Sequence, residues 1–170
     1  MGAKFFFILV LAGLLGPGGF QGGVFAEGMP REPQTSSSKK AWKLFELAQG
    51  ENPRLKWNTC LARKAAFRAE IMVSEGYFAH EDPDTGKNPA WGLVASCLEC
   101  SYAGENLSRG DYPPEEIHSA FMKSPTHRAN ILDGRFRFMG VGCFESVCVE
   151  LFGGSGVPAP PRLRRSMPYH

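Results

Sequence analysis

The feature that most constrains the fold of this chain is a change in the spacing of its apolar residues at Arg137. Before Arg137, apolar residues recur every three or four positions, which is the spacing of one face of a helix. Within 139–144 they recur at every second position, and a further apolar run, 147–152, follows a turn near Glu145-Ser146. These two runs predict an antiparallel hairpin. Helices followed by strands predict an α+β fold, with helices packed on an antiparallel sheet.

Four helical stretches are expected before the hairpin, each bounded by residues that favour a helix end. Their apolar positions lie in 41–48, 62–73, 117–121 and 128–132. Asn58 or Thr59 can cap the second helix, and Gly76 can end it in the left-handed conformation. Pro113 and Pro114 are typical of the first turn of the third helix.

The first 26 residues are expected to be a signal peptide. Lys4 precedes a short apolar run, 5–15, and small residues stand before position 27. The run is shorter than the roughly 20 residues that span a bilayer. We therefore expect cleavage near Ala26, with an uncleaved membrane anchor as the alternative, and a location outside the cell, in the periplasm or in the cell envelope.

The remaining residues divide by composition into a flexible segment (27–38), one compact domain (39–152) and a tail rich in Gly, Pro and Arg (153–170). The chain carries 19 basic and 17 acidic residues, a net charge of +2. This balance argues against a charge-driven nucleic-acid binder. After residue 26 the sequence has no stretch apolar enough to span a membrane, so we expect no transmembrane span in the mature chain. We also expect the exported protein to be a monomer.

Five cysteines allow several pairings. Cys143 and Cys148 can face each other across the hairpin turn, and Cys97 and Cys100 form a C-x-x-C that can close a small loop disulfide. Both pairs together have the spacing of a four-cysteine zinc site, but an oxidising compartment favours disulfides. Cys60 is then a buried thiol, with Cys97 or Cys100 as alternative partners.

Two histidines lie where helices end, which suits a cleft better than a core position does. His80 follows the second helix, and His127 follows the break at Pro125. Glu105 lies between a glycine and Asn106 near an expected strand edge. His118 lies within the third helix, as an exposed polar residue or at the rim of a site.

Four short motifs resemble, in order and rough spacing, those of the CAP superfamily of cysteine-rich secretory, antigen 5 and pathogenesis-related proteins. They are YFAH at 77–80, GENL at 104–107, SPTHRANIL at 124–132 and MGVG at 139–142. The third motif is similar to that of the bacterial SCP-domain branch. The resemblance covers about 39–152 and implies a three-layer α-β-α sandwich with a central antiparallel sheet.

The resemblance also implies a cleft in which His80, His127 and Glu105 bind a divalent cation such as Zn²⁺. Two imidazoles and one carboxylate predict weak, exchangeable binding that strengthens as pH rises. The same motifs make Asn106 and Asn130 candidate ligand-binding residues. The third helix departs from the family pattern: Phe121 replaces a frequent Trp, and Glu115 and Glu116 come too early to match a second acidic site residue.

Three functions are compatible with these residues. The first is a secreted binding module for a small hydrophobic ligand, a peptide or a cell-envelope polymer. The second is a metal-assisted hydrolase in which Glu105 is the base and His80 and His127 hold the metal. The third is an envelope protein whose Arg162, Arg164 and Arg165 bind an anionic surface. Whether the chain is an enzyme stays open on the sequence alone.

Overall fold

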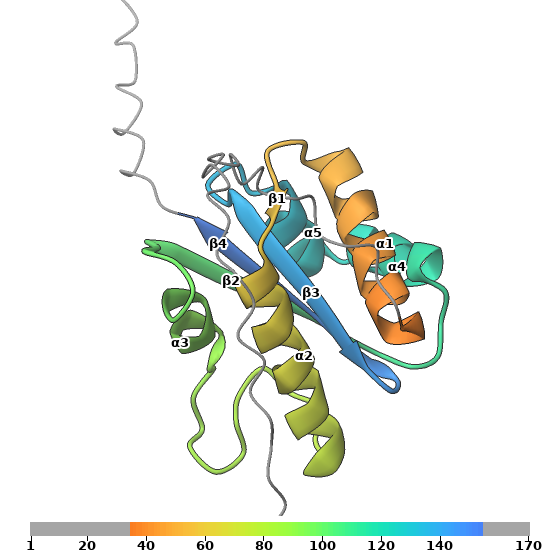
Figure 1. Ribbon diagram of the computed structural model, residues 1–170, viewed down its shortest axis with the longest axis vertical. Helices are drawn as coiled ribbons and strands as arrows, with labels where there is room; N and C mark the ends of the chain where they lie inside the picture. Colours follow the sequence, from red (N-terminus) through yellow and green to blue (C-terminus); the bar gives the residue numbers. More distant parts are fainter. Residues whose placement is uncertain (1–34, 155–170) are drawn as a thin grey trace, which may run out of the picture.

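The computed structural model describes residues 35–154, which form five helices and a four-stranded sheet (Figure 1). In chain order the elements are α1 (Ser36–Glu51), β1 (Lys56–Trp57), α2 (Thr59–Ser74), α3 (Ala90–Ala95), β2 (Tyr102–Arg109), α4 (Pro114–Lys123), α5 (Pro125–Leu132), β3 (Phe138–Phe144) and β4 (Val147–Gly154). The predicted signal peptide and most of the predicted tail lie outside the described residues. None of the helices within 35–154 is long and apolar enough to cross a membrane.

The sheet has the strand order β1-β3-β4-β2. β3 and β4 form the predicted hairpin, and β2 adds antiparallel to β4 over its whole length. β1 pairs in parallel with the start of β3, through Lys56 and Trp57 only. The α+β class is therefore confirmed, while the sheet is mixed rather than wholly antiparallel. A strand of two residues shows no periodicity, so β1 could not be predicted from the spacing of apolar residues.

Each face of the sheet is covered by its own helices, which produces three layers (Figure 1). Met139 and Val141 on β3 belong to a core cluster with α1, α4 and α5. Val149 and Leu151 on β4 belong to a second cluster with α2 and α3. Successive strand residues point to opposite faces, so alternating side chains supply both cores.

Two glycines of β3 allow α2 to lie directly on the sheet. A Cβ atom on Gly140 would stand 2.2 Å from the backbone nitrogen of Ala62, and one on Gly142 would stand 2.0 Å from that of Ala66. No real side chain fits at such distances, so the alternation of glycine with apolar residues in β3 is a packing requirement of α2.

The ordered elements extend beyond the expected domain at both ends. Thr35 caps α1 and forms a reciprocal capping box with Ser38, so residues 36–38 are helical although a flexible segment was expected there. β4 continues to Gly154, two residues into the expected tail. Asn58 caps α2, which was one of the two expected caps.

One predicted disulfide is confirmed and the other is wrong. Cys143 and Cys148 pair across the hairpin turn, but Cys97 pairs with Cys60, leaving Cys100 as a free thiol. The C-x-x-C interpretation considered only local spacing, whereas packing of α3 on α2 brings Cys60 and Cys97 together with Cα atoms 5.7 Å apart. With four sulfurs in disulfides, the four-cysteine zinc alternative is excluded.

Candidate functional site

The candidate site lies along β2, which is an edge strand of the sheet. His80 comes from the loop after α2, Glu105 from β2, and His127 from the first turn of α5. The two histidines therefore lie in different layers of the molecule. His80 is on the α2 side of the sheet, and His127 is on the α5 side. Only the fold brings these distant segments together.

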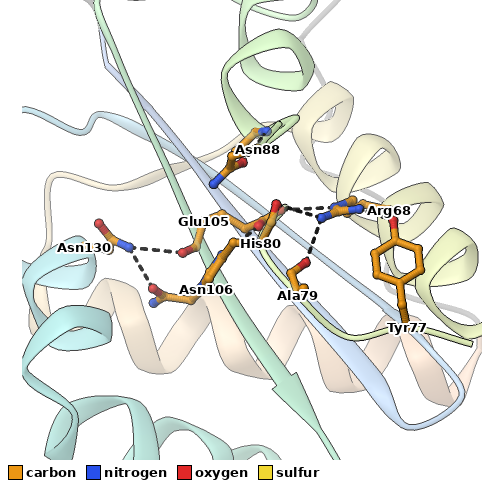
Figure 2. A network of polar contacts seen from close by, with 9 residues as sticks. Arg68, Tyr77, Ala79, His80, Asn88, Glu105, Asn106 and Asn130 are labelled. Carbon is orange, nitrogen blue, oxygen red and sulfur yellow. Dashed lines mark hydrogen bonds and ion pairs between the residues drawn. The ribbon is translucent and has the colours of Figure 1, made fainter. Parts of the chain in front are cut away.

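Glu105 holds His80 in place (Figure 2). The Glu105 side chain is buried, and its Oε1 lies 2.9 Å from Nδ1 of His80. Because an ionised carboxylate only accepts hydrogen bonds, Nδ1 of His80 is the donor in this contact. The other ring nitrogen, Nε2, is then left to bind a ligand, and the His80 side chain is 42% exposed.

Arg68 fixes both partners from behind (Figure 2). This arginine is 3% exposed, and its Nε lies 3.5 Å from Oε2 of Glu105. Its guanidinium also donates to the carbonyl oxygens of Ala79 and His80, at 2.9 and 3.1 Å, and to the hydroxyl of Tyr77. One buried cation thus neutralises the carboxylate and anchors the backbone that carries the imidazole.

His127 is the second imidazole of the site. Burial lowers the pKa of His127 below its usual 6.5, and the nearby His80 lowers it further. The ring contacts Phe121, with ring centroids 4.9 Å apart. Phe121 occupies the position where a tryptophan was expected from the family pattern, and it supplies part of the apolar surroundings that keep His127 neutral.

The two asparagines of the motifs connect β2 to α5 (Figure 2). Nδ2 of Asn130 donates to the backbone oxygen of Glu105 at 3.2 Å and to Oδ1 of Asn106 at 2.9 Å. Nδ2 of Asn106 donates to the backbone oxygen of His127 at 3.3 Å. Asn106 is fully buried, so its side chain supports the position of His127 from within the core.

Glu150 was not expected in the site and lies directly behind it. It is fully buried, and its Oε2 accepts a hydrogen bond of 3.0 Å from Asn106. Among the described residues no partner reaches its Oε1. Burial raises the pKa of Glu150 to about 8, so the acid is largely protonated at neutral pH.

Arg68 and Glu150 were missed because their local sequence resembles ordinary core. Arg68 falls on the same helical face as Ala65, Ala69 and Met72, all of which are buried. A charged residue on an apolar face was the available signal for Arg68. Glu150 similarly interrupts a run of apolar strand residues. His118, expected to be exposed or at a rim, is a buried residue of α4 that lies beside Glu51 of α1.

These contacts show which side chains of the predicted ligand set already have partners. Within 35–154, no three His, Cys, Asp or Glu side chains converge to hold an ion. Both oxygens of Glu105 already have partners, His80 and Arg68. The donors that remain for a cation are the two imidazoles, which suit Zn²⁺ and leave most of its coordination to solvent or ligand.

A groove of about 420 Å³ begins at His127 and runs between β2 and α4. Its lining includes Ser108 and Arg109 of β2, Tyr112, and Phe121 of α4. Glu116 also lines it, whereas Glu115 pairs with Lys43 of α1. A larger hollow of about 490 Å³, lined by Trp42 and others, lies between α1 and α2, away from the histidines.

Comparisons with known proteins agree with this architecture. A family model described as the cysteine-rich secretory protein family, CAP, matches residues 48–148. The uncharacterised protein YkwD of Bacillus subtilis is 33% identical over 109 residues, which are 61% of this chain and 42% of YkwD. The chain therefore spans less than half the length of this curated relative.

Solved structures show the same fold at low identity. An extracellular SCP-domain protein from Bacillus anthracis superposes with a TM-score of 0.63 at 21% identity, over 73% of this chain and 45% of that one. An outer surface protein from Borrelia burgdorferi gives a TM-score of 0.56 at 17% identity, over 66% of this chain and 90% of that one. The family model covers more than half of the sequence and the fold agrees with it, so this chain belongs to the CAP family.

Proposed function

We propose that this chain is an exported CAP domain that binds a divalent cation weakly through His80 and His127 and holds a ligand in the adjoining groove. The observation that carries the proposal is the contact between Glu105 and His80. It takes up Nδ1 of the ring and leaves Nε2 as the ligand atom, and Arg68 keeps the pair fixed.

The state of His127 supports the same role. A metal binds only the neutral imidazole, and the lowered pKa of His127 keeps that form present at neutral pH. Protons compete with the cation at both rings, so binding should strengthen as pH rises. A bound divalent ion would act as a Lewis acid, polarising an oxygen of whatever ligand reaches it.

Binding is better supported than hydrolysis. A hydrolase would need a free carboxylate beside the imidazoles to take a proton from water. Glu105 is 5% exposed and both of its oxygens are engaged, by His80 and Arg68. Its position suits a residue that orients His80 rather than a general base.

Export is part of the same proposal. The structural relatives include a protein described as extracellular and another described as an outer surface protein. Two disulfides within 35–154 are also typical of an oxidising compartment. These observations support a location outside the cytoplasm, as the sequence of residues 1–26 predicts.

Titration calorimetry with Zn²⁺ at pH 7.5 tests the cation site. We expect saturable, micromolar-or-weaker binding to the oxidised protein, lost in both His80→Ala and His127→Ala. His118→Ala is the matched control, because His118 is buried on α4 next to Glu51 of α1 and should not contribute. Binding that survives both site substitutions, or that is lost in the control alone, would exclude the proposed pair of ligands.

A further inference from the structure

One edge of β2 carries peptide groups that pair with no other strand of residues 35–154. The backbone nitrogen of Gly110, just after β2, donates toward β4, to the oxygen of Ser146 at 2.8 Å. The backbone oxygen of Glu105 points the other way, to Asn130. Peptide groups alternate between the two edges of an antiparallel strand, so those of Leu107 and Arg109 face the same way as that of Glu105.

The groove beside α4 lies against this edge. Leu107 lines the groove although its side chain belongs to the α2–α3 core on the other face of the sheet. No hydrogen bond from another described residue outside the sheet reaches the peptide groups of Leu107 or Arg109. They present donors and acceptors at intervals of roughly 7 Å along the strand.

The geometry points to an extended peptide as the ligand of this groove, added to β2 as a further antiparallel strand, the arrangement in which β2 already pairs with β4. A peptide backbone offers donors and acceptors at the same spacing as the edge of β2. A lipid chain would instead cover these peptide groups without replacing their hydrogen bonds with water. This inference names the ligand class for the groove of the proposed function and does not depend on the cation.

The side chains around the groove indicate which peptides would fit. Phe121 and Ile117 of α4 give one wall an apolar surface, suited to apolar residues at alternate positions of the added strand. The exposed Arg109 stands at the end away from the start of β2, with its guanidinium 6.0 Å from the ring centroid of Phe78. Glu116 also borders the groove, on α4. We therefore expect the groove to prefer peptides that place an acidic residue next to Arg109.

An NMR titration with acetyl-Glu-Val-Glu-Val-amide tests strand addition directly. The protein is first treated with EDTA, so that failure of the cation proposal leaves this result intact. The amide signals of Leu107 and Arg109 should shift and saturate. Two further probes carry N-methyl groups on both Glu residues or on both Val residues. Only one set of N–H groups can face β2, so one methylated probe should lose binding and the other should retain it.

Equal binding of both methylated probes, or equal loss, would overturn strand addition. So would saturation of the same two amides by a tetramer of N-acetylglucosamine with no response to the peptide. Absence of any shift with the unmethylated probe at millimolar concentration would overturn the inference as well.

The role of Arg109 is tested by reversing its charge. In Arg109→Glu, affinity for the acidic probe should fall about fivefold, the upper range for one exposed ion pair, while affinity for acetyl-Lys-Val-Lys-Val-amide should rise. Arg63→Glu is the matched control, since Arg63 is exposed on α2 outside this groove. An identical change in both variants would show that net charge, and not the Arg109 end of the groove, sets the preference.

Discussion

At the scale of single residues, burial decides what each ionisable group of the site can do. Arg68 and Glu105 are both buried and compensate each other, which fixes the ring of His80. Glu150 is equally buried but its only partner among residues 35–154 is the amide of Asn106. Without a cation beside it, the carboxyl avoids the cost of a buried charge by staying protonated.

Glu150→Gln should therefore change how stability depends on pH. The folded pKa of Glu150 is about 8 against an ordinary 4.5, so between these values the folded state holds a proton that the unfolded state has lost. Stability consequently falls as pH rises through this window. Glutamine keeps an acceptor for Asn106 and cannot ionise, so the variant should be more stable at pH 9 by an amount on the order of a few kcal/mol.

Urea unfolding of both proteins at intervals between pH 5 and 9 measures this difference. Glu70→Gln is the control, because Glu70 is exposed on α2. Parallel stability curves for Glu150→Gln and the parent would mean that the Glu150 carboxyl does not titrate within the window.

At the scale of elements, the position of α2 on β3 determines the position of the site, since α2 carries Arg68. Gly142→Ala should force α2 away from the sheet, because the new Cβ would lie 2.0 Å from the backbone nitrogen of Ala66. We expect a loss of about 1–3 kcal/mol in the free energy of unfolding, and weaker binding of Zn²⁺ through the displaced Arg68 and His80.

Gly50→Ala provides the contrast for this prediction. Gly50 lies within α1, and a Cβ there would meet nothing within 4 Å. It should raise stability by about 0.5–1 kcal/mol, because alanine favours a helix over glycine. Denaturant unfolding of both variants and the parent measures these changes in stability. If Gly142→Ala leaves the free energy of unfolding unchanged, the packing of α2 described above is wrong.

The elements that the sequence predicted are those whose signals are local. Apolar residues at every second position predicted the hairpin, and Asn58 and Pro114 marked the starts of α2 and α4. β1 and α3 were missed because two and six residues are too few to show a period. His80, Glu105 and His127 were predicted from short motifs, but the partners that fix them, Arg68 and Glu150, depend on contacts between distant segments.

At the scale of the whole molecule, the two disulfides constrain very different lengths of chain. Cys143–Cys148 closes a turn of the hairpin, with a sequence separation of 5, whereas Cys60–Cys97 has a separation of 37 and connects the start of α2 to the end of α3. The enclosed segment contains Arg68 and His80, so this bond limits how far the α2 side of the site can open. The entropy that a crosslink removes from the unfolded chain grows with the loop it closes.

Removing the longer crosslink should therefore cost more. Replacing Cys60 and Cys97 together by serine should lower the free energy of unfolding by about 4 kcal/mol, against about 2 kcal/mol for the same change at Cys143 and Cys148. Urea unfolding of the two double variants and the parent, under non-reducing conditions, measures both losses. Peptide mapping of the parent supplies the independent check. A fragment joining Cys97 to Cys100 instead of Cys60 would remove the basis of the larger loss, because a three-residue separation constrains almost none of the chain.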